Sequence, residues 1–327
     1  NTMDIDAKLR PLYLLQILQE RTDEDNYLTT AQLASILKQR YGMEPHRTTI
    51  KGDIEVLQQA GFGIDERRST QNQYRYLERE FEIAELKTMI DAIASSKFIP
   101  EEKSDALIKK VTALAGIYKA RDLKRNVVVD GRGKLENKQI FYIIDTINEA
   151  INQHKKIRFR KIEYNVKKER VLHHGGEKYT FSPYSLVWDG DNYYVVGYSD
   201  KYENIGSHRV DRIAEQPEIL DEPAVPPKAG FSVEKYVKTT FRMYNAPRKE
   251  VELLCDNGVM DAIIDQFGPD VHTYAGDLQN FRVIEEVAVG KVFFNWIFGF
   301  EGKVRIKAPA DVKEQYRQMV ENAAKVL

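Results

Sequence analysis

Aromatic and cationic side chains gather between Ser182 and Ile213, and these residue types can bind a flat anionic molecule. Tyr193 and Tyr194 lie in an apolar run, and segment 208–213 reads His-Arg-Val-Asp-Arg-Ile. An arginine offers paired N–H donors that match phosphate oxygens, and a tyrosine ring can stack on a nucleobase. The composition therefore predicts a surface for nucleotide or nucleic-acid recognition.

Strand geometry limits how many of these side chains can face one ligand. Asp189-Gly190-Asp191-Asn192 is a turn signal, so the flanking runs are predicted to be strands. Successive residues of a strand point to opposite faces, which places Tyr193 and Val195 on one face and Tyr194 on the other. One of the two tyrosines can thus belong to the core.

A local excess of positive charge precedes this segment. Between Lys155 and Arg170 the chain has eight basic residues and two acidic ones, Glu163 and Glu169. On alternating strands such a run would charge one face of a sheet. It equally fits a solvated edge strand that lysines protect from pairing.

No grouping of side chains indicates catalysis or metal binding. The sequence lacks a phosphate-binding glycine loop with a lysine, and Gly131-Arg132-Gly133 is too short for one. His173 and His174 are adjacent, so neither helix nor strand directs both rings at one metal, and the single Cys255 offers no thiolate pair for zinc. We predict no catalytic residues, no metal ligands, no cofactor and no enzymatic activity.

Bulk composition bounds the class of protein. A length of 327 residues predicts two or three domains, and no run of about 18 apolar residues indicates a membrane span. The first residues lack a basic and apolar leader, and one cysteine fits a reducing compartment, so we expect a cytoplasmic protein. The formal net charge of −1 shows no global basic excess, but nucleic-acid binding needs only a local patch.

Residues 1–80 are predicted to form a winged helix-turn-helix domain. Leucines recur at helical spacing up to Leu18, Thr29 or Thr30 can cap a helix over 31–41, and a third helix opens at 45–48. Two short strands over 63–77 would form the wing. The third helix of such a domain enters the major groove, and the hairpin touches the backbone. The candidate DNA-binding residues are His46, Arg47, Thr48, Thr49, Lys51, Arg67, Arg68 and Arg75.

Two alternatives stay open for this domain. A three-helix protein-interaction module with ordinary surface charges would have the same pattern. Asp53 would repel phosphate if it faced DNA, so we expect it to pair with a basic neighbour.

Three further regions follow. Residues 81–137 are predicted as a helical linker or dimerisation region with two helices, the second beginning at Pro100, and with a polar linker over 121–138. Residues 138–222 are predicted as a helix, 140–154, and five or six short strands that form a compact barrel. After a proline-bearing connector at 222–227, residues 223–327 are predicted as a small α+β domain. The fold class is therefore a multidomain α+β protein.

The order of these features resembles bacterial WYL-domain transcription regulators. The segment His46 to Ile54 is similar to the DNA-reading helix of that family, with Thr48 and Gly52 where the family has arginines. Tyr193-Tyr194-Val195 stands at the position of the family's Trp-Tyr-Leu signature. The C-terminal region, with Trp296 and its neighbours, is similar to the extension that follows the WYL domain. The resemblance covers nearly the whole chain.

The resemblance implies an Sm-like β-barrel that senses a nucleic-acid-derived or nucleotide-like effector. Carried over position by position, the effector-binding residues would be Ser182, Tyr184, Tyr194, His208, Arg209 and Arg212. Arg212 stands beside Asp211 and can instead brace a strand end, and a single histidine near an apolar strand is usually packed.

The leading hypothesis is a transcription regulator that acts as a homodimer, binds a double-stranded DNA operator and responds to a nucleotide or oligonucleotide. The alternative is a single-strand DNA- or RNA-binding module whose main activity lies in the basic aromatic barrel. An enzyme acting on nucleotides is the third hypothesis.

Overall fold

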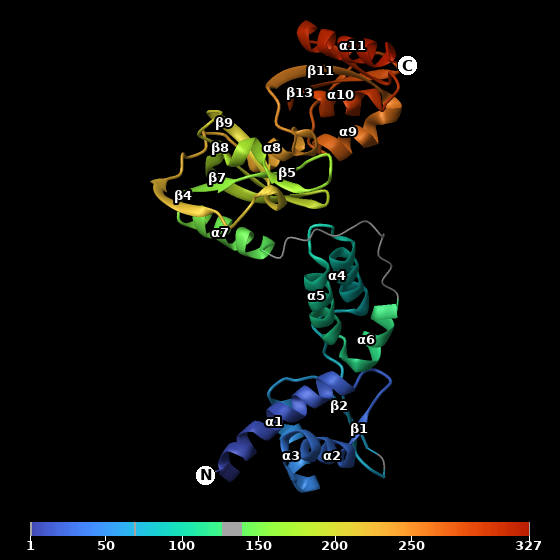
Figure 1. Cartoon of the computed structure of the whole chain (residues 1–327). Coiled ribbons are helices and arrows are strands. Elements are labelled where there is room, and N and C mark those ends of the chain that lie inside the picture. Colours follow the sequence, from blue (N-terminus) through green and yellow to red (C-terminus); the bar gives the residue numbers. More distant parts are fainter. Residues whose placement is uncertain (1, 69, 126–138, 327) are drawn as a thin grey trace. The chain divides into compact units, whose positions relative to one another are not determined.

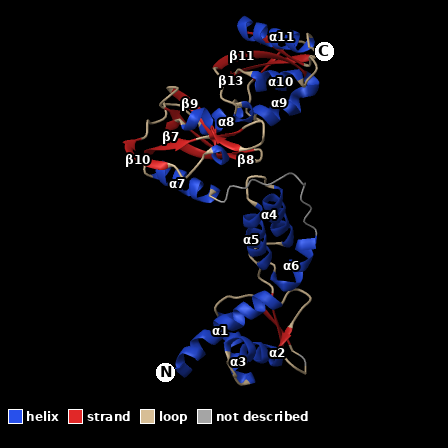
Figure 2. Cartoon of the chain, viewed as in Figure 1, coloured by secondary structure: helices blue, strands red, loops and turns tan. Residues whose placement is uncertain are grey.

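The computed structural model describes residues 2–68, 70–125 and 139–326. Among the residues up to 125, side chains are described only between residues 7 and 123. The chain forms two compact units, Asn1–Glu136 and Asn137–Leu327, each with its own core. They are described one after the other. Figure 1 labels the elements, and Figure 2 separates the helices from the strands.

The first unit begins with three helices and a small sheet. The helices are α1 (Thr2–Arg21), α2 (Thr30–Tyr41) and α3 (Arg47–Gln59), and the strands β1 (Leu28–Thr29), β2 (Ile64–Arg67) and β3 (Gln73–Tyr76) pair in the order β1-β3-β2. Their apolar faces share one core, which includes Leu14, Leu33, Ile50, Ile54 and Tyr74. These are the elements of a winged helix-turn-helix, as the sequence predicted.

Local chemistry fixes the limits of α2. The Thr29 hydroxyl accepts a hydrogen bond from the Gln32 backbone N–H, and the Gln32 side chain accepts one from the Thr29 N–H. This capping box satisfies two donors that the first helical turn leaves unpaired. At the other end Gly42 adopts the left-handed conformation that ends many helices.

The rest of the first unit has three helices rather than the predicted two. They are α4 (Ile83–Ser95), α5 (Glu101–Ala113) and α6 (Gly116–Arg125). Gly116, with φ +77°, ends the run that the sequence suggested was continuous, and a Cβ there would lie 3.1 Å from the Glu20 carbonyl oxygen. Residues 121–125 are therefore helical and not part of a polar linker. The remaining linker, 126–138, lies outside the described residues.

The second unit begins with a helix and a five-stranded antiparallel sheet. Helix α7 (Ile140–Asn152) precedes β4 (Lys155–Arg160), β7 (Lys178–Asp189), β8 (Asn192–Ser199), β9 (Asn204–Arg209) and β10 (Glu218–Pro223), which pair in the order β10-β4-β7-β8-β9. Helix α7 packs against β4 and β7, the strands that carry the buried residues Ile157 and Phe181.

Two details of this sheet differ from the sequence prediction. The predicted strand 169–172 lies in a separate hairpin of β5 (Ile162–Tyr164) and β6 (Arg170–Leu172), and the expected connector at 222–223 is the end of edge strand β10. Proline is tolerated there because an edge strand does not need every N–H for pairing. Among the described strands no ladder joins β9 to β10, so the Sm-like barrel stays a prediction.

The C-terminal part of the second unit is a four-stranded sheet covered by helices. Strands β11 (Arg248–Asp256), β12 (Thr273–Ala275), β13 (Asn280–Ala288) and β14 (Val304–Ala308) pair in the order β12-β13-β11-β14. In Figure 1 helix α11 (Ala310–Ala324) lies on one side of this sheet, and α9 (Met260–Phe267) and α10 (Lys291–Phe298) lie on the other. Burial raises the pKa of the Cys255 thiol to about 12, so this residue is an inert part of the core.

Helix α8 (Val233–Lys238), which the sequence pattern did not predict, connects the two sheets of this unit. No helix in the described part of the chain has the length and apolar character that a bilayer crossing requires.

Candidate functional sites

The outer face of α3 is the first candidate site. Ile50, Ile54 and Leu57 face the core, which leaves His46, Arg47, Thr48 and Lys51 exposed and Thr49 half-buried. The backbone N–H of Thr48 donates to the His46 ring Nδ1 at 3.4 Å, so His46 caps the helix. Arg47, Thr48 and Lys51 line a hollow of about 240 Å³ together with residues 70–72 of the wing turn. The helix face and the wing thus lie side by side.

The three wing arginines have different surroundings. Arg67 is exposed, and Arg68, whose side chain is 82% exposed, lies 3.9 Å from Glu66. Arg75 instead donates to Asp65 at 2.8 Å and to the Glu24 carbonyl. These contacts brace the hairpin, and the DNA-binding role of Arg75 stays a prediction.

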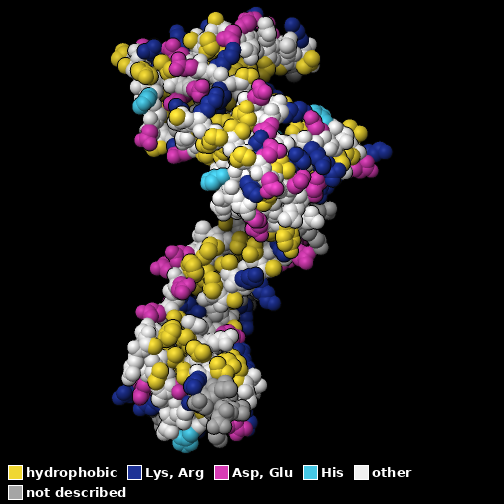
Figure 3. Space-filling view, turned by 90° about the vertical axis from the view of Figure 1, so that its left-hand side faces the viewer, with side chains coloured by type: hydrophobic (Ala, Val, Ile, Leu, Met, Phe, Trp, Pro, Cys, Tyr) yellow, Lys and Arg dark blue, Asp and Glu magenta, His cyan; other side chains and the backbone are white. Residues whose placement is uncertain are grey.

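Asp53 pairs with a basic neighbour, as expected from the sequence. Its carboxylate accepts hydrogen bonds from Arg10 Nε at 2.5 Å and Nη2 at 3.3 Å, across helices α1 and α3. The negative charge is therefore compensated within the unit. Figure 3 shows Lys and Arg side chains interspersed with Asp and Glu over the face it presents, which agrees with the net charge of −1.

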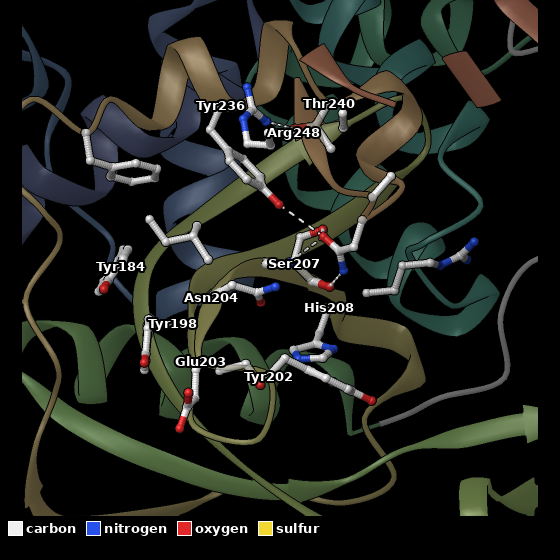
Figure 4. Close-up of a pocket in the computed structure, with 18 of the residues that line it drawn as sticks. Tyr184, Tyr198, Tyr202, Glu203, Asn204, Ser207, His208, Tyr236, Thr240 and Arg248 are labelled. Carbon is white, nitrogen blue, oxygen red and sulfur yellow. Dashed lines mark hydrogen bonds between the residues drawn. The ribbon is translucent and has the colours of Figure 1, made fainter. Parts of the chain in front are cut away.

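The second candidate site is a groove of about 1500 Å³ along edge strand β9. One wall comes from the first sheet and the β5 hairpin, and the other from segment 225–248, which includes α8. Around β9 in Figure 4, Tyr236, Thr240 and Arg248 lie above in the view, and Tyr184, Tyr198, Tyr202 and Glu203 lie below or to the left. The lining contains six lysines or arginines and three glutamates. This composition favours an anionic ligand with aromatic rings.

The structure brings four of the six predicted effector residues to this groove and not the other two. Tyr184, His208, Arg209 and Arg212 line it. Ser182 is fully buried, and its Oγ accepts a hydrogen bond from the Val225 backbone N–H at 2.9 Å. Tyr194 is 9% exposed and packs with Val196 and Tyr236 in the core. Ser182 and Tyr194 thus do not line the groove, and the effector-binding role predicted for them stays a prediction that this geometry does not support.

A buried carboxylate holds the two arginines. Asp211 lies in a short 3₁₀ turn, Val210–Arg212, and its side chain is 1% exposed. It accepts from Arg209 Nε at 3.0 Å and Nη2 at 2.9 Å, and Arg212 Nε lies 3.7 Å away. The hydrogen bonds that Arg209 donates to Asp211 raise the pKa of Arg209. Asn192 accepts a further bond from Arg209 at 2.7 Å, so this guanidinium has a fixed orientation.

His208 and Lys161 occupy the same end of the groove. The His208 ring lies against Phe181 and Phe159, at centroid distances of 4.9 and 5.3 Å. Burial, together with the nearby Lys161 ammonium, lowers the pKa of His208 to about 3. The ring is therefore neutral at pH 7. Desolvation by burial is also the main cause of a lowered pKa at Lys161.

Asn245 links β9 to the segment that leads into the second sheet. Its Oδ1 accepts from the Ser207 backbone N–H and from the Tyr236 hydroxyl, both at 3.0 Å. Its Nδ2 donates to the Ser207 carbonyl at 2.8 Å, so the amide pairs with the strand edge as a neighbouring strand would. Ser207, which precedes His208 on β9, is therefore bridged to the segment that leads into the C-terminal part of this unit.

Sequence reasoning did not single out several groove residues: Lys161, Tyr198, Tyr202, Tyr236, Asn245 and Arg248. Lys161 belonged to the basic run 155–170, which was a usable signal. Tyr198 and Tyr202 lie within the aromatic segment 182–213 but were not selected from it. Tyr236, Asn245 and Arg248 lie beyond that segment, and no local pattern marks them. His173 and His174 stack at 3.8 Å, and the described residues contain no group of three His, Cys, Asp or Glu suited to a metal.

The part of the chain that contains this groove matches a known protein family. Residues 142–218 match the sequence model of the WYL domain. The chain contains a WYL domain. The match begins in α7 and ends at the first residue of β10, so it covers β4, β7, β8, β9 and the Asp211 turn.

Two solved structures are similar at low identity. The proteasome accessory factor B/C (PafBC) of Arthrobacter aurescens is 14% identical over 95% of this chain, with a TM-score of 0.32, and this chain spans 48% of its length. A CRISPR Cas-related protein is 13% identical over 98% of this chain and 83% of its own, with a TM-score of 0.38. A search of the curated proteins found no match.

Proposed function

We propose that this protein is a DNA-binding transcription regulator whose WYL domain senses a nucleic-acid-derived or nucleotide-like effector. The observation that carries the proposal is the exposed face of α3 beside the wing turn, in a chain that also contains a WYL domain.

The DNA-facing residues suit the two kinds of contact that a duplex offers. Arg47, Lys51, Arg67 and Arg68 can bind phosphates, and Thr48 can reach a base edge. The contact between Lys51 and Glu55, at 3.8 Å on the surface, leaves the ammonium free to exchange partners. His46, as the helix cap, positions the first turn, and Thr49 lies partly inside.

The effector-facing residues suit an anionic, base-bearing molecule. Arg209 and Arg212 present guanidiniums held by Asp211, and the exposed ring of Tyr202 offers a stacking surface. The groove exceeds the roughly 300–1,000 Å³ typical of small-ligand pockets. Its size leaves room for a dinucleotide or a longer piece as well as a mononucleotide.

We further propose a homodimer that pairs two DNA-binding domains through residues 81–125. Exposed apolar side chains in this segment support the proposal: Phe81, Ile83, Leu114, Ile117 and Tyr118. An effector regulates DNA binding only if its affinity differs between the two arrangements of these domains.

The test of DNA binding is a salt titration with duplex DNA from upstream of the protein's own gene and with a shuffled duplex of equal composition. We expect the preference for the upstream duplex to persist as salt weakens both affinities. Arg47→Ala should weaken upstream binding about tenfold or more, while Lys38→Ala, which removes one charge from α2 beside Glu44, should have little effect. Equal affinity for both duplexes would contradict the proposal.

The same preparation separates the regulator from the single-strand-binding alternative. A regulator should bind the upstream duplex more tightly than either of its single strands. Arg209→Lys keeps a positive charge beside Asp211 but loses the forked N–H donors of the guanidinium. It should therefore reduce the effector response and leave duplex affinity unchanged. Tighter binding to single strands, lost in Arg209→Lys, would favour the alternative.

A further inference from the structure

Lys161 lies where the first sheet meets the β5 hairpin, at the end of the groove that also holds His208. Its carbonyl accepts from the His173 N–H at 2.9 Å, and its backbone bridges to Ile213. Its side chain is half-buried, with Nζ 4.5 Å from the centroid of the Tyr179 ring. The backbone contacts fix the position of the Lys161 main chain, and the Tyr179 ring lies against the end of its side chain.

The ammonium of Lys161 forms no ion pair among the described residues, and the Glu163 and Glu177 carboxylates attract it only from a longer distance. No carboxylate oxygen lies within 4.0 Å of Nζ, and no hydrogen bond to it is present in that part of the chain. The neighbouring Lys201, which faces the same Tyr179 ring at 5.3 Å, is paired with Glu177 at 2.7 Å. The Tyr179 ring attracts this cation, but a half-buried ammonium without an ion pair is still costly, so an anion in the groove would lower the free energy of this region.

The other groove cations are compensated or solvated. Arg209 and Arg212 share the single negative charge of Asp211. Arg248 donates to Thr240 and to the Glu286 carbonyl and lies 3.5 Å from the Glu286 carboxylate. Lys228 and Lys235 are exposed, so water solvates them. Lys161 is therefore the groove cation with the strongest need for an anion.

His208 supplies a second group at this end of the groove. Its ring centroid lies 6.1 Å from that of Tyr179, the ring that Lys161 covers. Within the described residues its ring nitrogens have no hydrogen-bond partner. Because the neutral ring keeps one N–H, it can donate to an anion without taking up a proton.

We propose that Lys161 and His208 form the subsite for a phosphate group, so that the effector is a phosphate ester of a nucleoside and not a free base or nucleoside. This inference rests on the effector-sensing part of the proposed function. The exposed ring of Tyr202 belongs to the same groove and would stack on the base, while Arg209 and Arg212 remain donors for a second phosphate or the sugar.

Calorimetric titration of the full-length protein tests the proposal. The probes are the four common 5′-nucleoside monophosphates and their four nucleosides. At least one monophosphate should bind ten or more times as tightly as its nucleoside. In Lys161→Met that ratio should fall below about three, and in Lys161→Arg it should largely return. Lys201→Met is the matched control, because it removes a lysine from the same tyrosine ring but one that already has a counter-ion.

Several outcomes would overturn the phosphate subsite. They are equal affinities for nucleotide and nucleoside, equal losses in Lys161→Met and Lys201→Met, or no binding of any monophosphate. Duplex binding, measured on the same preparations, keeps this failure separate from that of the regulator proposal. A thermal melt of each variant checks folding, and Lys161→Met should be at least as stable as the wild type without ligand, because it removes an uncompensated cation.

Discussion

Replacing Asp211 by asparagine tests whether this buried carboxylate organises the end of the groove where we propose that the effector binds. Asp211→Asn preserves the side-chain volume but removes the charge that Arg209 and Arg212 share. It also directs an NH₂ group toward guanidinium donors, so at least one hydrogen bond is lost. We expect the second unit to lose stability and Arg209 to lose its fixed orientation.

The magnitude follows from burial. A hydrogen bond to a charged group contributes about 1.5–3 kcal/mol, and breaking a fully buried ion pair costs about 3–5 kcal/mol. The side chains of Arg209 and Arg212 are 35% and 32% exposed, so water can solvate the released charges. We therefore expect Asp211→Asn to lower the free energy of unfolding by about 2 kcal/mol, near the lower end of these ranges. For a unit of this size that is a decrease in Tm of about 4–8 °C.

Tryptophan fluorescence measures the stability of the second unit, which contains Asp211. Trp188 and Trp296 are the only tryptophans in the sequence, and both lie in the second unit, so urea or thermal unfolding followed at these residues reports on it alone. Asp221→Asn is the control, because this exposed carboxylate pairs with Lys155 at the surface. A change in Asp211→Asn no larger than that of the control would refute the reasoning.

Three further predictions follow from the contacts described. The pKa of His208 in the folded protein, about 3, lies below the usual 6.5, so the contribution of the neutral ring to stability is complete above pH 6.5 and is lost as pH falls toward 3. When pH is lowered from 7.5 to 5, the free energy of unfolding, followed by tryptophan fluorescence, should decrease by up to about 2 kcal/mol. His208→Phe should flatten this pH dependence. Gly116→Ala forces a left-handed backbone on alanine beside the Glu20 carbonyl, so hydrogen exchange in α1 and α6 should accelerate by at least fivefold, and unchanged exchange would contradict the packing described. Ser182→Ala leaves the Val225 N–H without its acceptor and should cost about 1–3 kcal/mol in urea unfolding, while nucleotide affinity changes less than twofold; a large loss of affinity would return Ser182 to the ligand site.

The elements that the sequence predicted well are those fixed by neighbouring residues. Helix α2 has its cap at Thr29 and its stop at Gly42, and both signals lie within the segment itself. Helix α6 was not predicted as a separate helix, because the helical pattern that begins at Pro100 was interpreted as continuous through Gly116 and the residues from 121 onward as a linker. Its helical state depends on packing against α1, which is distant in sequence. Strand β10 was likewise hidden, since Pro223 is acceptable only at a sheet edge that local sequence does not reveal.

The groove residues could not all be predicted from the sequence, because strand β8 is buried on both of its faces. Alternation divides Tyr194 from Val195 but cannot say which face meets a ligand. Both residues are buried, because β8 lies between the α7 side of the sheet and the α8 segment. The ligand-facing residues then shift to the edge strand β9, where Arg209 and His208 were predicted, and to Lys161, which β-strand pairing brings to the same end.

The charges in this groove suggest separate tasks for its cations. Asp211 compensates one of its two arginines, and the pair is held in place before any ligand arrives, so these guanidiniums provide orientation at little cost in side-chain entropy. Lys161 has no such partner, so an arriving anion gains more from it than from a cation already paired. A ligand placed against Lys161 and His208 also lies on β9, whose Ser207 is tied to Asn245 and Tyr236. Strength of binding would then come from Lys161, specificity from the arginines, and the link to the C-terminal part of the unit from Asn245.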